Sequence, residues 1–386
     1  MKEQFAIIGA GIGGLTLALT LKQKGHEVTI FESASEIKPV GAGIIMANNA
    51  MQVFRTLGMK EKIEKAGNKV SSMKITDEQL KAISSIELAK FEAKYGVYNV
   101  AIHRADLQRL LAEEIGLEHI QLSKRLSKIE RIEGFNLTFD DNTTAKSRIV
   151  IGADGIHSTV RKEIFEVGEI RDTRQVCWRG VCEVELPKEY EHTAFEAWGK
   201  GLRFGFVKIN SQKVYWYAVA SEGLVPSGSV NLSGLFRTFH SDVLRIIAAT
   251  PAETIFFSKI TDLKPISIWQ DKGACLIGDA AHATTPNMGQ GACQAIEDAY
   301  AIGKLLESGK PMDQVFSEYE RVRMKKAHQI VNTSWTMGKL AHLENGLGIW
   351  LRNAALGIVP SSLNDKQLDG VFDIGYIDSE VEKLKS

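Results

Sequence analysis

One stretch near the start of the chain limits the fold more than any other: residues 5–32, FAIIGAGIGGLTLALTLKQKGHEVTIFE. An apolar run leads into a glycine-rich turn, then into a periodic apolar segment typical of a helix, and a second apolar run ends on Glu32. This order predicts strand, turn, helix, strand and acid, the arrangement of a dinucleotide-binding unit. The alternative is a glycine-rich turn in an ordinary α/β sheet. The spacing between the turn and Glu32 favours a nucleotide-binding site over this alternative.

Each glycine of this turn has a physical reason in a nucleotide site. Gly9 permits the tight turn, Gly11 lets the backbone approach a pyrophosphate, and Gly14 lets the helix pack closely on the sheet. The start of the helix presents unpaired N–H groups to the phosphates. Glu32 can accept hydrogen bonds from a ribose.

Length and charge narrow the classes of function. The 386 residues can form two or three domains or one large composite unit. Lys and Arg together number 47, and so do Asp and Glu, so we expect no nucleic-acid partner. The four cysteines lack any metal-ligand spacing, which predicts no metal site and free buried thiols in a reducing cytoplasm. We expect no signal peptide and no integral membrane segment, because glycines interrupt the apolar stretch at 5–21.

Two later segments repeat the pattern of a strand that ends in a glycine turn. GADGIHS occupies 152–158, and GDAAHATTPNMGQG occupies 278–291. Between them, residues 175–220 are aromatic and rich in β-forming residues, which predicts an antiparallel sheet inserted into the nucleotide-binding domain. Helical patterns follow at 316–338 and 340–356, before a polar tail.

The order and separation of the three glycine motifs resemble those of the FAD-dependent aromatic hydroxylases, the para-hydroxybenzoate hydroxylase-type single-component flavoprotein monooxygenases. The chain looks closest to the small bacterial branch with salicylate hydroxylase-like and urate hydroxylase-like members. The resemblance implies an α/β fold: a Rossmann-like FAD-binding domain with an inserted antiparallel β-sheet substrate domain and C-terminal helices. The implied divisions are residues 1–174 for the first part of the FAD-binding domain, including short substrate-domain strands around 69–100, 175–265 for the substrate domain, 266–310 for the return segment, and 311–386 for the C-terminal helices and tail.

The same resemblance implies an FAD- and NAD(P)H-dependent monooxygenase that hydroxylates a small aromatic or heteroaromatic molecule through a flavin C4a-hydroperoxide. FAD is expected to bind non-covalently, with NADH or NADPH as a transient co-substrate and O₂ as the oxidant. A monomer or homodimer in the cytoplasm is expected. Two alternatives remain: a flavin-dependent epoxidase of an alkene or isoprenoid, and a flavin-binding redox sensor without turnover.

The resemblance also assigns the residues that bind the cofactor. They are Gly9, Gly11, Ile12, Gly13, Gly14, Glu32, Gly43, Ile44, Arg104, Leu126, Asp154, Asp279, Pro286, Gly289, Gln290, Gly291 and Ala292. Gly43 and Ile44 belong to a glycine-rich loop at 40–45 that is expected to lie beside the flavin ring. Asp279 binds the ribityl chain, caps the helix after it, or does both. Asp154 either contacts the cofactor or fixes its own turn and pairs with Arg161.

Three residues are expected to orient the substrate: Arg203, Tyr215 and Tyr217. Alternation along a strand places the two tyrosines on one face. An arginine inside an apolar strand is costly unless it is paired, so Arg203 either reaches solvent or orients an anionic or carbonyl-bearing aromatic. In the urate hydroxylase-like branch an arginine and a tyrosine at similar places contact the substrate. Arg179 is either structural or a further substrate contact.

Overall fold

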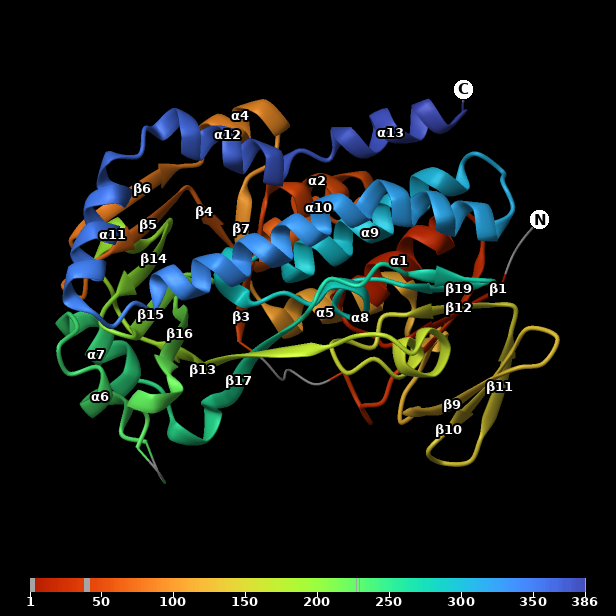
Figure 1. Cartoon of the computed structure of the whole chain (residues 1–386), viewed down its shortest axis with the longest axis horizontal. Helices are drawn as coiled ribbons and strands as arrows, with labels where there is room; N and C mark the ends of the chain where they lie inside the picture. The colour runs from red at the N-terminus through yellow and green to blue at the C-terminus, as the bar shows by residue number, and fades with distance from the viewer. Residues whose placement is uncertain (1–3, 38–41, 227, 229, 386) are drawn as a thin grey trace.

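The structure is a computed structural model that describes residues 4–37, 42–226, 228 and 230–385 (Figure 1). Residues 40 and 41 of the predicted glycine-rich loop lie outside these ranges. Within the described residues, no helix has the length and apolar composition that a membrane span requires. All four cysteines are free and buried, as predicted.

A six-stranded sheet forms around the first strand of the chain. Its order is β18 (Gln270–Asp271), β19 (Ala274–Leu276), β12 (Ile149–Gly152), β1 (Gln4–Ile8), β2 (Glu27–Phe31) and β8 (Ile120–Gln121). All neighbours except β18 and β19 pair in parallel. The carboxyl ends of β1, β2, β12 and β19 therefore meet at one edge, and the three glycine motifs and Glu32 follow those ends. The Rossmann-like sheet is confirmed.

Helices on both sides of this sheet are contributed by distant parts of the chain. They are α1 (Ile12–Gln23), α5 (Arg104–Ile115), α8 (Asp279–His282), α9 (Gly291–Leu306) and α10 (Met312–Ala341). Helix α1 packs against α5 and α9 and is buried along most of its length. Helix α10 runs from the six-stranded sheet to the second large sheet and so spans both halves of the molecule (Figure 1).

The second large sheet has seven strands. Its order is β17 (Phe256–Leu263), β13 (Ile170–Glu183), β16 (Lys213–Ser221), β15 (Leu202–Lys208), β14 (Thr193–Trp198), β5 (Ser72–Thr76) and β6 (Ala82–Glu87). The antiparallel sheet predicted within 175–220 is present. Strands β5 and β6 join it from the first third of the chain, in the region 69–100 where short strands are expected. The division of the chain into domains stays a prediction.

The two faces of this sheet differ in character. Side chains alternate across a strand, so one face of β14, β15 and β16 carries Phe195, Phe204, Phe206 and Trp216. This aromatic face is buried against α6 (Leu232–Leu235) and α7 (Ser241–Ala248) in a core of its own. The opposite face carries the polar side chains discussed below.

Smaller elements complete the fold. Two three-stranded sheets consist of β3 (Gly43–Met46), β7 (Asn99–His103) and β4 (Asn68–Val70), and of β11 (Thr144–Ser147), β10 (Phe135–Phe139) and β9 (Leu126–Arg131). The remaining α-helices are α2 (Asn48–Thr56), α3 (Lys60–Ala66), α4 (Ala89–Tyr95), α11 (Gly346–Ile358), α12 (Ser361–Phe372) and α13 (Gly375–Lys385). The polar tail is thus helical and anchored, because Ile377 and Val381 of α13 are buried.

Candidate active site

The first glycine turn leaves one open position. A Cβ atom on Gly9, whose φ is +107°, would lie 2.5 Å from the Ala153 carbonyl oxygen, and one on Gly14 would lie 2.2 Å from the Gly9 carbonyl oxygen. Both glycines are therefore required by the fold itself. A Cβ on Gly11 would meet no protein atom within 4 Å. The space beside Gly11 is thus open, as the approach of a pyrophosphate to the backbone requires.

Close packing joins the first motif to the third. Cβ atoms on Gly13 and Gly278 would lie 2.7 and 2.8 Å from the Cβ of Ala295 in α9. Ile12, the first residue of α1, is 4% exposed and belongs to the core. Its side chain packs inside the protein, so only the backbone at this position remains for a ligand.

Glu32 is held by the turn that it follows. Its Oε2 accepts from the Ala10 N–H at 2.8 Å, and its Oε1 accepts from the Ala34 N–H at 2.8 Å. An ionised carboxylate has about four acceptor positions, so capacity for ribose hydroxyls remains. The Lys124 N–H donates to the Glu32 carbonyl at 2.7 Å and places the start of β9 nearby. Leu126, the first residue of β9, is a buried core residue.

Arg104 and Asp279 come from distant elements and interact electrostatically. Arg104 begins α5 and is exposed, and no hydrogen-bond partner for its guanidinium is present in the described part of the chain. Asp279 is exposed although Gly278 and Ala280 beside it are buried. Because protein surrounds the Asp279 carboxyl on several sides, burial raises its pKa, while the charges of His282 and Arg104 lower it. Solvent reaches this carboxyl directly and lessens the penalty of burial, so Asp279 is ionised.

Asp279 does not cap the helix that it begins. The N-cap of α8 is Gly278, and no side chain makes a capping hydrogen bond there. The helix-cap alternative for Asp279 is therefore wrong, and its carboxylate is left for a ligand.

Asp154 fixes its own turn. Its carboxylate accepts from the Ser158 hydroxyl at 2.5 Å and from the N–H groups of Thr159 and Val160 at 2.7 and 3.1 Å. Burial raises the pKa of Asp154, against these hydrogen bonds, which lower it. The Arg161 guanidinium donates to the carbonyls of Ala280 and Ile156, so its pairing with Asp154 is through charge alone: burial lowers the pKa of Arg161, and the charge of the Asp154 carboxylate raises it.

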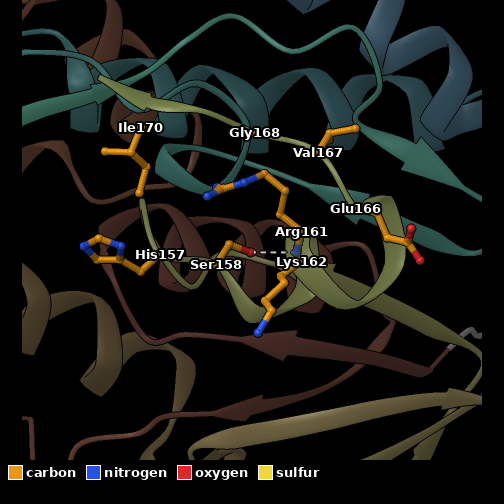
Figure 2. Close-up of a pocket in the computed structure, with 8 residues that line it drawn as sticks. All are labelled: His157, Ser158, Arg161, Lys162, Glu166, Val167, Gly168 and Ile170. Carbon is orange, nitrogen blue, oxygen red and sulfur yellow. Dashed lines mark hydrogen bonds between the residues drawn. The ribbon is translucent and has the colours of Figure 1, made fainter. Parts of the chain in front are cut away.

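A hollow of about 520 Å³ lies beside this turn (Figure 2). The lining residues are His157, Ser158, Arg161, Lys162, Glu166, Val167, Gly168 and Ile170. Figure 2 shows the side chains of Arg161 and Lys162 pointing in opposite directions. The Arg161 guanidinium is already bound to two carbonyls, and none of the predicted substrate residues lines this hollow. We therefore do not place the aromatic substrate here.

The third motif ends at an uncapped helix. Pro286 is exposed, Gly289 has a left-handed φ of +62°, and α9 starts at Gly291. No side chain caps this N-terminus, so its first N–H groups, including that of Ala292, are available to an anion. The Gln290 side chain points inward, because its Oε1 accepts from Asn49 at 2.9 Å. Gln290 thus offers only its backbone to a ligand.

The strand β3 contacts the second large sheet. Gly43 and Ile44 lie in β3, paired with β7, and not in a loop as predicted. A Cβ on Gly43 would lie 2.4 Å from the Cβ of Tyr215, so the side chain of Tyr215 packs directly against the Gly43 backbone. This contact requires a glycine at position 43 and connects a predicted flavin-binding segment with the polar face of the sheet.

Strand register collects the polar side chains on one face. Glu196, Gly205 and Tyr217 lie opposite one another across β14, β15 and β16, and Arg203 lies two residues from Gly205 on the same face. A Cβ on Gly205 would lie 2.1 Å from Cζ of Tyr217, so the tyrosine ring crosses over this glycine. Its hydroxyl thereby reaches Glu196 and donates to Oε2 at 2.6 Å.

Arg203 is buried and paired within the protein. Its side chain is 3% exposed and donates to Glu196 Oε1 at 3.1 Å, His342 Nε2 at 2.7 Å and Asn287 Oδ1 at 2.7 Å. The solvent-reaching alternative is therefore wrong. None of these three partners is among the site residues predicted from the sequence. A signal for Glu196 was present, since it is a lone acid between apolar residues of a strand, as Arg203 is a lone cation.

The two tyrosines lie on one face, as predicted, with ring centroids 6.1 Å apart. Burial raises the pKa of the Tyr215 hydroxyl, against the charge of Arg179, which lowers it. Burial raises the pKa of Tyr217 as well, and the charge of Glu196 adds to that rise. Both phenols are thus neutral hydrogen-bonding groups at physiological pH. Arg179 also donates to the Ser258 hydroxyl at 2.8 Å, which supports the structural reading of this arginine.

The donor set and the open positions fit FAD. The space beside Gly11, the exposed guanidinium of Arg104, the exposed carboxylate of Asp279 and the uncapped start of α9 suit a pyrophosphate, a polyol and an electron-rich ring edge. These groups lie at or beside the edge where the strands of the six-stranded sheet end, which is where nucleotides bind in such folds.

Comparisons with known proteins agree with this site. Residues 2–334 match the family described as FAD binding domain. The chain is 35% identical over 364 residues to aurachin C monooxygenase/isomerase of Stigmatella aurantiaca, covering 93% of this chain and 95% of that protein. It is 30% identical over 369 residues to 2-heptyl-3-hydroxy-4(1H)-quinolone synthase of Pseudomonas aeruginosa, covering 92% and 94%.

A solved structure shares the whole architecture. The crystal structure of Klebsiella pneumoniae HpxO complexed with FAD and uric acid superposes with a TM-score of 0.86 at 25% identity, covering 98% of this chain and 97% of that one. Both the family match and the relatives extend over most of the chain. The protein belongs to the FAD binding domain family, as one of the flavoprotein monooxygenases that its three glycine motifs predict.

Proposed function

We propose that this protein uses FAD and NAD(P)H to hydroxylate a small, ring-nitrogen-containing aromatic compound. The observation that carries the proposal is the junction between the two large sheets. Tyr215 of the second sheet packs on Gly43, and Arg203 of the same face bonds to Asn287 in the third motif. The polar face of the sheet therefore lies against the two segments assigned to the flavin ring.

One set of residues binds the cofactor and another set orients the substrate. Gly11, Arg104 and the start of α9 bind the charged parts of FAD, and Glu32 and Asp279 accept hydrogen bonds from its hydroxyls. When bound, FAD supplies the activation of O₂ with electrons from NAD(P)H. Tyr215, Tyr217 and Arg203, with its partners, form the wall that orients the substrate and excludes water.

The names of two relatives support this substrate class. One is named for a 4(1H)-quinolone and another, with solved structure, binds uric acid, so both names refer to nitrogen heterocycles that carry ring carbonyls. The sheet face presents both hydrogen-bond donors and acceptors for such a ring. Epoxidation and redox sensing are the two alternatives, and no contact among the described residues favours either of them. We place the enzyme in the cytoplasm, because its four cysteines are free.

The experiment is a panel of 4-quinolones, purines, indoles and hydroxybenzoates added to the FAD-loaded protein. The expected result is substrate-stimulated consumption of NADH or NADPH and a product that has gained one oxygen atom. Nuclear magnetic resonance of that product separates a hydroxylated ring from an epoxide. Tight FAD binding without stimulation by any compound would favour the redox sensor.

A further inference from the structure

Glu196 is the acidic residue of the polar sheet face, and within the described residues its side chain accepts three hydrogen bonds. Oε1 accepts from Trp198 Nε1 at 2.7 Å and from Arg203 Nη1 at 3.1 Å, and Oε2 accepts from the Tyr217 hydroxyl at 2.6 Å. A carboxylate that receives three donors, one of them a guanidinium, is in its ionised, acceptor-only form. Glu196 is therefore a fixed negative charge beside the tyrosine.

Exposure decides which member of this group a ligand can meet. The side chain of Arg203 is 3% exposed, whereas that of Glu196 is 20% exposed. Tyr217 is only partly buried. A molecule on this face thus contacts the carboxylate and the phenol before it contacts the arginine, whose charge is already matched by Glu196.

The direction of the Tyr217 hydroxyl follows from the same contact. Its single proton is committed to Glu196, and burial together with that negative charge keeps the phenol protonated. The lone pairs of the hydroxyl oxygen remain and can only accept. The reachable polar atoms of the Tyr217–Glu196 pair are all acceptors.

We infer that Glu196 determines substrate charge in this enzyme: it cancels Arg203 and turns Tyr217 into an acceptor, so the site takes an uncharged aromatic ring that carries an N–H or O–H donor. The inference rests on the proposed function and names the substrate class of that site. A carboxylate-bearing substrate is disfavoured, because it would meet the Glu196 carboxylate first, while the guanidinium of Arg203 is only 3% exposed and already paired. This replaces the expectation that Arg203 orients an anionic aromatic.

Three compounds of similar size test whether the site selects its substrate by charge, by a ring N–H donor, or by both. 4-Quinolone is neutral and carries a ring N–H, chromone has an oxygen atom in place of that N–H, and salicylate is an anion. Their binding is measured on the FAD-loaded protein by the change in flavin absorbance. The wild type is expected to bind 4-quinolone about tenfold or more tightly than either other compound, the size expected for one lost hydrogen bond to a buried acceptor.

The variant Glu196→Gln tests the residue itself, since it keeps the shape and removes the charge. It is expected to bind FAD as the wild type does, to lose about tenfold in affinity for 4-quinolone and to bind salicylate more tightly. The matched control is Glu189→Gln, the same substitution at an exposed position.

Several outcomes would overturn the inference. One is equal binding of chromone and 4-quinolone to the wild type, and another is tighter binding of salicylate. If Glu196→Gln does not hold FAD, the comparison of the three compounds on the wild type still decides. Oxygenation of anionic aromatics alone would overturn the role of Glu196 and leave the proposed function intact. A failure of every aromatic compound to stimulate NAD(P)H consumption would instead remove the proposed function.

Discussion

Nη2 of Arg203 lies 2.7 Å from Oδ1 of Asn287, and this hydrogen bond fastens the seven-stranded sheet to the loop before α9. Asn287 is itself held in place, because its Nδ2 donates to the Thr285 hydroxyl at 2.9 Å and to the Ser334 carbonyl at 2.8 Å. Arg203 is thus a buried connection between the substrate wall and the flavin loop, which makes its removal informative.

Arg203→Ala is expected to lower the stability of the protein and the coupling of NAD(P)H consumption to product formation. The variant removes the buried guanidinium that donates to Glu196 and Asn287, at a cost of about 1–3 kcal/mol in the free energy of unfolding. Without the connection the substrate wall shifts relative to the flavin loop, so a larger share of the NAD(P)H consumed should appear as peroxide. Urea unfolding and the ratio of peroxide to product measure the two effects.

Arg203→Lys serves as the matched variant. Lysine keeps the charge but lacks the planar fork that reaches His342, Glu196 and Asn287 together. It should recover part of the stability and little of the coupling. Unchanged coupling in both variants would show that the arginine supports the fold alone.

His342 gives the protein a pH dependence that starts near neutrality. Burial, and then the charge of Arg203, lower the pKa of His342 from 6.5 to about 2. The unfolded chain binds a proton below pH 6.5 and the folded protein does not, so this contribution to stability is complete above that pH and is lost as the pH falls. The expected loss approaches about 1.4 kcal/mol per pH unit below 6.5.

The measurement is urea unfolding of the FAD-saturated protein at about pH 7.5 and about pH 5.5. His342→Gln is the control, because the glutamine oxygen can accept from Arg203 Nε without titrating. The wild type should lose more stability between the two pH values than this variant. Equal losses would mean that His342 is not the group that titrates.

The fold near the nucleotide was predictable because its signals are local. The turn around Gly9 and Gly14 needs glycine for reasons that lie within a few residues, and apolar runs mark β1, β2 and β12 directly. A short loop and a short strand have similar local sequence patterns. The sequence therefore predicts a loop at Gly43 and Ile44, whereas pairing with β7 places both residues in a strand.

The polar network of the substrate wall was not predictable from the sequence alone. Arg203 and His342 are 139 residues apart, and Arg203 and Asn287 are 84 apart. Their contact depends on strand register and on where the 30-residue helix α10 ends, neither of which is encoded in a short motif. The pattern identified Arg203 as unusual but not its partners.

Alanine substitutions at Gly11 and Gly14 are expected to affect different properties: cofactor binding at Gly11 and folding at Gly14. A Cβ on Gly11 meets open space at an ordinary φ of −68°, so Gly11→Ala should leave the stability of the apoprotein unchanged. Its methyl group would occupy the approach of the pyrophosphate, and FAD affinity should fall about tenfold or more. Thermal unfolding of the apoprotein and fluorescence titration with FAD measure the two quantities.

Gly14→Ala is the opposite case. Its Cβ would lie 2.2 Å from the Gly9 carbonyl oxygen, so the backbone must move, at a cost of about 1–3 kcal/mol in the free energy of unfolding of the apoprotein. A Gly11→Ala variant that is as unstable as Gly14→Ala would contradict the open space beside Gly11.

Substitution of Asp279 is the sharpest test of cofactor binding, because the Asp279 side chain does not also cap a helix. Gly278, not the Asp279 side chain, precedes α8 as the N-cap, so Asp279→Ala should leave the apoprotein as stable as the wild type. A charge-assisted hydrogen bond to a cofactor hydroxyl contributes roughly 1.5–3 kcal/mol, which corresponds to about tenfold or more in FAD affinity. Asp279→Asn retains one acceptor without the charge and should fall between the alanine variant and the wild type. Wild-type FAD affinity in Asp279→Ala would show that the carboxylate does not contact the cofactor.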